Sequence, residues 1–276
     1  MGSVVLIALI LLGIKLVKLY LNRYHIRPNF SNLFVGSQGT GKTLIGTKQA
    51  IKLHRKALFN VRMYNLLHPF KEKLPTPYLY SSIPLNYRYY KELTARHLLM
   101  LDKINDNSIV FIDEVGQVVS KHAWKKKYVN QTIQEFVRLA RHYYGKKWGA
   151  IIYTEQSLED VEVDIRRRCG ISMNLNSMRK WFGILYYVDV YEIVCIDGVA
   201  NTSSVNQSDH KNNYLFGFFP LKKLYDTFCY SENYPCISKP NDIASDIIEH
   251  MKSKGLIDLE KCYQENADCI SIREYS

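Results

Sequence analysis

Eight residues near the front of the chain have the types and spacing of a phosphate-binding loop. Residues 36–43 match the pattern G-x-x-x-x-G-K-[ST] at every defined position. Glycines let the backbone turn several N–H groups toward one phosphate, Lys42 is placed to reach the β- and γ-phosphates, and the Thr43 hydroxyl is placed to ligate Mg²⁺. The sequence therefore predicts a nucleoside triphosphate site made of Gly36, Ser37, Gln38, Gly39, Thr40, Gly41, Lys42 and Thr43.

Two adjacent carboxylates supply the second half of such a site. Residues 109–112 are consecutive apolar residues, typical of a buried parallel strand, and Asp113 and Glu114 follow them. Asp113 is predicted to hold Mg²⁺, directly or through water, and Glu114 to polarise the attacking water. The alternative is a strand that merely ends in an acidic turn, and the phosphate loop upstream favours the hydrolytic site. No N-K-x-D motif is present, so ATP is favoured over GTP.

Further polar residues are expected near the phosphates. Gln156 follows an apolar run at 148–153, and it is predicted to sense the γ-phosphate or orient water if that strand lies between the other two. Arg166 and Arg167 end a predicted helix at 158–168. They are predicted to reach the ATP of a neighbouring subunit as arginine fingers. The alternative for them is a solvated basic helix end, which the helix dipole favours.

The elements that must position these groups follow from apolar periodicity. Residues 30–35 predict a strand and residues 44–54 a helix, the frame that the glycine loop needs. Further strands are predicted at 78–83, 108–112, 148–153 and 171–175, helices at 91–101, 131–144 and 158–168, and a β-hairpin at 181–196. The expected fold is α/β, a P-loop NTPase with a mainly parallel central sheet flanked by helices, plus an N-terminal transmembrane helix.

The front of the chain is apolar enough to enter a membrane. Residues 4–21 carry only Lys15 and Lys18 as charged residues, near the lower length limit of a spanning helix. The basic residues lie on the C-terminal side, which predicts a single-pass anchor with the N-terminus outside and the remainder cytoplasmic. The alternative is an amphipathic helix lying on the membrane surface. The predicted division is 1–24 anchor, 25–235 ATPase domain and 236–276 C-terminal helical tail, whose helix lies at 241–254.

Charge points to an anionic partner. The 276 residues carry a net charge of +11 with a pI near 9.2, which suits a nucleic acid or a lipid surface. A cluster around Trp124, made of Lys121, Lys125, Lys126 and Lys127, is predicted to contact DNA, with a solvated loop as the alternative. The equal spacing of Cys229/Cys236 and Cys262/Cys269 is wider than in short metal-binding hairpins, so no metal site is expected there.

Four segments together resemble the Zot-like ATPases, the gene I assembly proteins of filamentous phages. The resemblance covers about residues 30–175, with a weaker similarity at 224–227. Its segments are 34–43, 111–114, the arginine-histidine-tyrosine-glycine helix end at 138–145, and 152–156 together with 164–167.

This resemblance implies an FtsK/HerA-type motor that forms a homo-oligomeric ring such as a hexamer. It would be a membrane-anchored ATPase of the host inner (cytoplasmic) membrane that hydrolyses ATP to drive filamentous phage assembly and export of single-stranded phage DNA. Phage coat or assembly proteins would be its partners. The predicted helix precedes the ATPase here, whereas family members usually place it afterwards, so direct docking to an outer-membrane channel is not expected. The alternatives are a DNA packaging or conjugation-type translocating ATPase and a non-motor, nucleotide-controlled membrane scaffold.

Overall fold

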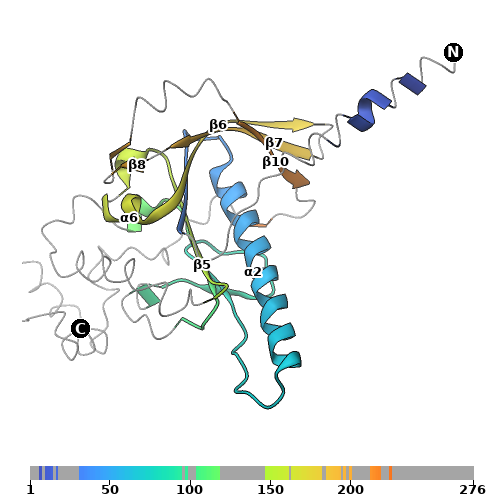
Figure 1. Ribbon diagram of the computed structural model, residues 1–276. Helices are drawn as coiled ribbons and strands as arrows, with labels where there is room; N and C mark the ends of the chain where they lie inside the picture. The colour runs from blue at the N-terminus through green and yellow to red at the C-terminus, as the bar shows by residue number, and fades with distance from the viewer. Residues whose placement is uncertain are drawn as a thin grey trace, which may run out of the picture.

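An eight-stranded, mainly parallel sheet forms the centre of the protein (Figure 1). A computed structural model of the 276-residue chain describes residues 31–94, 97–98, 104–118, 147–161, 163–181, 185–193, 195–196, 199–200, 212–218 and 224–225, with 6–7, 10–14 and 17 near the front. The order across the sheet is β10-β7-β6-β1-β5-β4-β2-β3. The six strands from β6 to β3 pair in parallel, and β7 and β10 extend the sheet in antiparallel pairing.

The strands are short in the parallel half and long in the antiparallel half. Their bounds are β1 Ser31–Val35, β2 Leu79–Ser81, β3 Tyr90–Glu92, β4 Ile109–Ile112, β5 Ala150–Glu155, β6 Cys169–Trp181, β7 Leu185–Ile193 and β10 Asn212–Phe218. A separate pair consists of β8 Cys195–Ile196 and β9 Val199–Ala200. The apolar runs of β4 and β5 are buried throughout, as expected for parallel strands covered on both faces.

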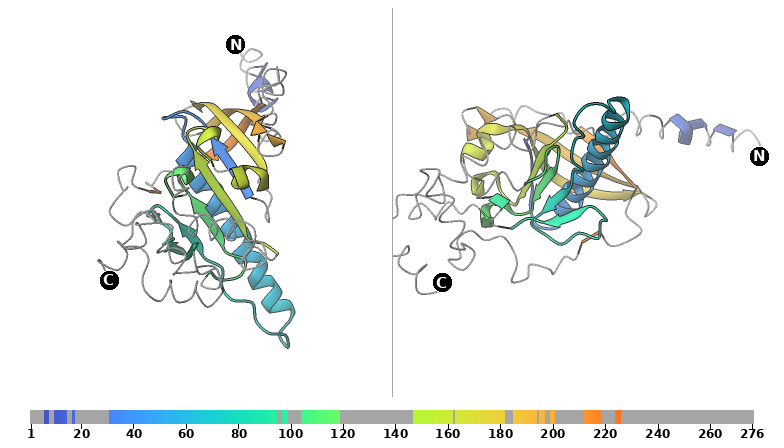
Figure 2. Two further views of the ribbon diagram at one scale, coloured as in Figure 1. Left: turned by 90° about the vertical axis from the view of Figure 1, so that its left-hand side faces the viewer. Right: turned by 90° about the horizontal axis from the view of Figure 1, so that it is seen from below.

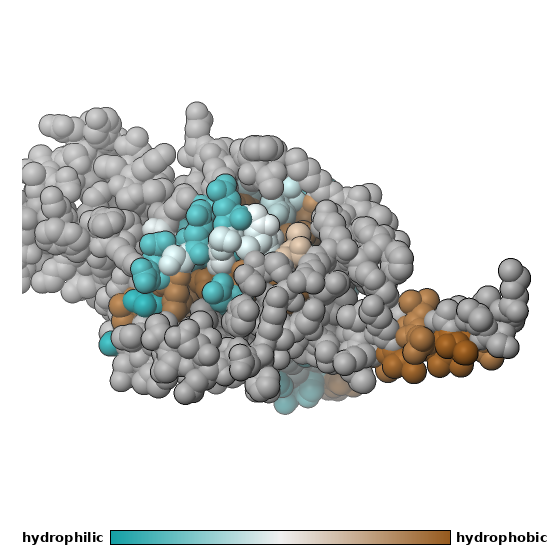
Figure 3. Space-filling model, turned by 90° about the horizontal axis from the view of Figure 1, so that it is seen from above, coloured by the Kyte–Doolittle hydropathy of each residue, from teal (hydrophilic) through white to brown (hydrophobic). Residues whose placement is uncertain are grey.

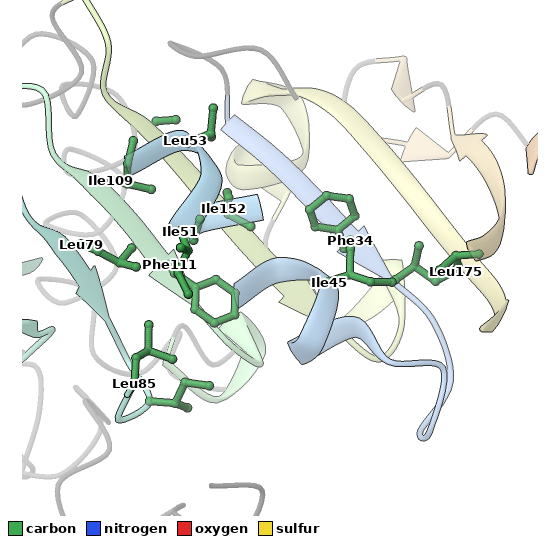
Figure 4. Packing of buried hydrophobic residues seen from close by; sticks show 14 residues of the cluster. Phe34, Ile45, Ile51, Leu53, Leu79, Leu85, Ile109, Phe111, Ile152 and Leu175 are labelled. Carbon is green, nitrogen blue, oxygen red and sulfur yellow. The ribbon is translucent and has the colours of Figure 1, made fainter. Parts of the chain in front are cut away.

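Among the described residues, one long helix, α2 (Lys42–Leu67), packs on one face of the sheet. It ends at Leu67, with His68 as its C-terminal cap, because the following Pro69 disfavours helical backbone in the residue that precedes it. Gly46 lets the helix approach closely, since a Cβ there would lie 2.6 Å from Cε2 of Phe111. Figure 4 shows the resulting core between α2 and the strands, with Phe34, Ile45, Ile51, Leu53, Leu79, Leu85, Ile109, Phe111, Ile152 and Leu175 labelled.

The sheet is strongly twisted rather than flat (Figures 1 and 2). The amide of Asn86, which follows β2, donates to the carbonyl of Leu224 at 2.7 Å. Val188 of β7 belongs to the same buried cluster as Leu85, so the antiparallel half shares the core of the parallel half.

The predicted elements that fall among the described residues are confirmed in order, with three differences in extent and one in pairing. The β-hairpin predicted at 181–196 is wrong in its pairing, because its core is the single strand β7, which pairs with β6 on one side and β10 on the other. Residues 91 and 92 belong to the edge strand β3, so the predicted helix at 91–101 is wrong at its start, although residues 97–98 are helical. The edge strand forms because Tyr90–Glu92 pairs with β2. Helix α2 continues 13 residues beyond its predicted end at His54, and β6 is far longer than the predicted strand at 171–175 because it also pairs with β7.

Several predictions lie outside the described residues. These are the helix at 131–144 with Arg138 and Arg141, the lysine cluster around Trp124, the tail helix at 241–254 and the two cysteine pairs. In the predicted membrane segment, residues 6–7, 10–14 and 17 are helical, and their large apolar side chains are exposed (Figure 3). Within the part of the chain that the structure describes, no helix combines the length and the apolarity needed to span a bilayer.

Candidate nucleotide-hydrolysing site

The phosphate loop joins the carboxyl end of β1 to the first turn of α2. Gly39 and Gly41 have φ values of 83° and 82°, a left-handed conformation that costs glycine little. The first hydrogen bond that closes a turn of the helix runs from the Ile45 amide to the Gly41 carbonyl at 2.9 Å. The N–H groups of the preceding residues point out of a helix N-terminus, where an anion is stabilised by direct hydrogen bonds and by the helix dipole.

Strand β6 lies against one side of this loop. A Cβ at Gly36 would stand 2.5 Å from the carbonyl oxygen of Leu175, and one at Gly41 would stand 2.8 Å from the sulfur of Met178. The backbone carbonyl of Leu175 leaves no room for a side chain at Gly36, and a side chain at Gly41 would displace the thioether of Met178. The close approach of β6, together with the left-handed turns, accounts for the glycines that define the motif.

Lys42 is held inside the loop. Its side chain is 8% exposed, and its ammonium group donates to the Ser37 carbonyl at 3.1 Å. Burial lowers the pKa of Lys42, while the nearby charges of Asp113, Glu114 and Glu155 oppose that shift. A buried ammonium group that bonds to one loop carbonyl is stabilised further when a phosphate oxygen contacts it.

Asp113 is the most highly connected carboxylate of the site. The Thr43 hydroxyl donates to both carboxylate oxygens at 3.0 Å, and the Thr154 hydroxyl donates to Oδ1. The Asp113 amide in turn donates to Oγ of Ser82 at 2.9 Å. Asp113 is 1% exposed, so these hydrogen bonds fix the position of a buried charge at the carboxyl end of β4.

The oxygen set around Thr43 and Asp113 fits Mg²⁺. A threonine hydroxyl and a carboxylate that are already in contact are hard oxygen donors, and Mg²⁺ is usually bound by one or two such groups plus substrate phosphates and water. No group of three or more His, Cys, Asp or Glu side chains that would make an all-protein metal cage occurs among the described residues. The arrangement therefore suits a metal that arrives with a nucleotide.

Glu114 adopts a backbone conformation that is unusual for its residue type. Its φ is 49°, at the turn between β4 and the short helix α4 (Val115–Val118). Left-handed backbone in a residue other than glycine costs of order 1 kcal/mol and is often found at functional sites. The Glu114 amide donates to the Thr154 hydroxyl at 3.2 Å, and its carboxylate accepts from the exposed Gln156 side chain at 3.2 Å.

The predicted strand order is confirmed and places Gln156 beside Glu114. Strand β5 pairs with β1 on one side and with β4 on the other. Its carboxyl end therefore lies between the phosphate loop and the two carboxylates, as the prediction for Gln156 required. The structure brings together Lys42, Thr43, Asp113, Glu114 and Gln156 at one edge of the sheet.

The arginines stand at the opposite edge. Arg166 and Arg167 lie in the last turn of α6 (Val163–Arg168), and the next residue, Cys169, pairs with Ser31 at the start of β1. The phosphate loop begins after Val35, about 13 Å further along the strand. These side chains are thus remote from the phosphate loop of their own chain, and contact with the nucleotide of a neighbouring chain remains a prediction.

Three residues of the site had no predicted role. Ser82 and Thr154 hold Asp113 and the Glu114 backbone, and Glu155 is a carboxylate that is only 5% exposed. Glu155 accepts from the amides of Gly116 at 2.5 Å and Gln156 at 2.8 Å, and its carbonyl accepts from the Gly36 amide at 3.2 Å. Burial raises the pKa of the Glu155 carboxyl, with the neighbouring Glu114 and Asp160 adding to the rise. The polar run 154–156 at the end of a predicted strand was the one feature of the sequence that could have indicated these roles.

Comparisons with known proteins agree with the motif set. The family model "Zonular occludens toxin (Zot)" matches residues 31–217, more than half of the chain. A search of curated proteins found no match.

Among solved structures, the N-terminal domain of zonular occludens toxin from Neisseria meningitidis is 16% identical, with a TM-score of 0.37, covering 71% of this chain and 98% of that one. The FIGL-1 AAA domain in complex with ADP is 15% identical, with a TM-score of 0.31, covering 56% of this chain and 46% of that one. Both likenesses are remote, so the fold assignment rests on the observed strand order and the phosphate loop.

Proposed function

Because the chain belongs to the zonular occludens toxin (Zot) family of P-loop ATPases of phage assembly, we propose that it is an ATPase that drives assembly and export of filamentous phage. One observation carries the proposal. Strands β1, β4 and β5 end side by side, so that the phosphate loop, the Thr43–Asp113 pair and the Glu114–Gln156 pair converge on one space.

Each group has a role in hydrolysis at that space. Lys42 and the loop amides bind the β- and γ-phosphates, and Thr43 and Asp113 hold Mg²⁺. Glu114 accepts a hydrogen bond from the attacking water and Gln156 orients it, since both side chains lie at the rim and are already hydrogen-bonded to each other. ATP is the proposed substrate, and the absence of an N-K-x-D guanine-reading motif is the argument for preferring it to GTP.

Membrane attachment through residues 4–21 and a ring of several copies complete the proposal. The apolar composition of that segment supports attachment. The position of Arg166 and Arg167, away from their own phosphate loop, supports the proposal that they contact the nucleotide of a neighbouring chain. Export of single-stranded phage DNA, with coat or assembly proteins as partners, is proposed from membership of the family.

Steady-state ATP hydrolysis by the full chain tests the site. Glu114→Gln is expected to bind Mg²⁺-ATP with nearly unchanged affinity and to lose hydrolysis by about 100-fold or more. Glu159→Gln, which neutralises an exposed carboxylate near the same strand end, is the matched control and should hydrolyse at the parent rate. Equal rates for the two variants would refute the role of Glu114. Phage export that survives abolished hydrolysis would refute the motor and leave the scaffold.

A further inference from the structure

The distal half of α2 and the turn after it expose large apolar side chains that the domain leaves uncovered. Phe59 is 62% exposed, Leu66 71%, Leu67 67% and Phe70 102%. Phe59 and Leu66 are seven residues apart, so they lie on one face of the helix, opposite the buried Ala57 and Val61. We call residues 55–73 the α2 tip.

Basic residues surround this apolar face. The α2 tip contains five basic residues, Arg55, Lys56, Arg62, Lys71 and Lys73, and one acidic residue, Glu72, and all six are exposed. Helix α2 itself contains no aspartate or glutamate at all. Arg62 donates to the Tyr89 hydroxyl at 3.0 Å, which steadies its side chain beside the helix.

The turn that carries Phe70 is fixed to the helix. The side-chain amide of Asn65 donates to the Leu74 carbonyl at 3.0 Å, and its oxygen accepts from the Leu74 amide at 2.9 Å. The His68 amide donates to the Tyr64 carbonyl at 3.0 Å, and the two rings stack with centroids 4.4 Å apart. Phe70 is thus presented to the outside by a hydrogen-bonded turn, and its exposure is a property of the folded chain.

The α2 tip projects from the edge of the sheet opposite the phosphate loop. The Tyr64 ring lies 6.5 Å from that of Trp148, which precedes β5, and β5 begins level with Ser31 at the start of β1. The residues after Tyr64 reach beyond that edge, where α2 stands clear in Figure 1. The chain also enters β1 at this edge.

We propose that the α2 tip binds the surface of an anionic lipid bilayer, as a second membrane contact beside the proposed attachment through residues 4–21. The inference rests on the membrane location in the proposed function. A helix face with Phe and Leu along its centre and Lys and Arg at its borders is the composition of interfacial helices, which bury the apolar groups at the acyl boundary and hold lipid phosphates with the cations. A nucleic acid would use the cations and leave the four apolar side chains in water.

Photo-crosslinking of the full chain in bilayers identifies what the α2 tip touches. Phe70 is replaced by p-benzoylphenylalanine, and the chain is placed in vesicles of phosphatidylcholine with or without 30% phosphatidylglycerol, a proportion on the order of that in anionic membranes. The expected product is a lipid adduct that requires phosphatidylglycerol and declines in high salt. The same substitution at Glu159, which follows the carboxyl end of β5, should give no lipid adduct. Chain–chain adducts, nucleic-acid adducts or no adduct would each overturn the inference.

A charge variant and an extraction step separate this contact from the proposed anchor. Lys56→Gln/Lys71→Gln/Lys73→Gln should lower the adduct yield at position 70 by about fivefold for each charge removed, while Lys91→Gln on β3 should leave it unchanged. Carbonate washing reports attachment through residues 4–21. The wash and the crosslinking are carried out on separate samples of the same vesicles. If carbonate removes the chain but the crosslinked sample contains the lipid adduct, the anchor is refuted and the α2 tip is supported. If carbonate does not remove the chain and no adduct forms, the α2 tip alone is refuted.

Discussion

Thr154→Val tests whether one buried hydroxyl organises the hydrolytic site. Valine has the shape of threonine and the same preference for strands, so the change removes only the hydroxyl. That hydroxyl donates to the buried Asp113 carboxylate and accepts from the Glu114 amide. A hydrogen bond to a charged group contributes about 1.5–3 kcal/mol and a neutral one about 1 kcal/mol, so the expected loss in unfolding free energy is about 2–4 kcal/mol.

For a domain of this size, that loss corresponds to a fall of roughly 5–15 °C in the midpoint of thermal unfolding. We also expect kcat to fall more than KM changes, because the left-handed backbone of Glu114 loses the acceptor that holds its amide. Thr154→Ser is the control, since it keeps the hydroxyl and removes a methyl group. Thermal unfolding and ATP hydrolysis of the full chain are measured for both variants. A valine variant that is no less stable than the serine variant would refute the reasoning.

Three further changes test the packing and the buried charges. Gly46→Ala should destabilise the chain by about 1–3 kcal/mol in denaturant unfolding, because the new Cβ would stand 2.6 Å from Phe111. Alanine normally favours helices, so a loss of stability here would report the close contact. Adding Phe111→Leu to the same chain should recover part of the loss. Burial lowers the pKa of His54, whose ring bonds to the Pro77 carbonyl and the Tyr87 hydroxyl. The contribution of His54 to stability should therefore be complete above pH 6.5 and be lost as the pH falls below that value. His54→Gln should flatten this decline in unfolding free energy, and an equally steep decline in the variant would contradict the role of His54. Glu155→Gln cannot accept from both the Gly116 and Gln156 amides and should slow hydrolysis. Because burial raises the pKa of Glu155, the difference in unfolding free energy between parent and variant should shrink as the pH rises from about 4.5, and a constant difference would count against the assignment.

Much of the site was predictable because its groups follow directly on buried strands. The apolar runs before Gly36, Asp113 and Gln156 fix where β1, β4 and β5 end, and parallel strands bring their carboxyl ends to one edge. The contacts between those ends were not predictable. Which hydroxyl meets Asp113 depends on the register of β4 against β5, which the local sequence does not specify.

The antiparallel half escaped prediction for a similar reason. The length of β6 comes from its pairing with both β1 and β7, and the bond between Asn86 and Leu224 joins residues far apart in the sequence. The edge at which Arg166 and Arg167 stand also depends on the register of β6 against β1. Local periodicity carries no information about such pairings.

The order of strands in the sheet has a consequence for the order in which the protein folds. Helix α2 is synthesised early, yet two of the strands that it packs against, β4 and β5, begin about 40 and about 80 residues after the helix ends. Contacts between such distant segments form slowly, because the entropy of closing a long loop is lost before the contacts are gained. A nascent chain therefore holds the apolar residues of α2 without part of their cover until translation has passed β5. During that interval a chaperone would have its main opportunity to bind, and a stalled ribosome would release an aggregation-prone fragment.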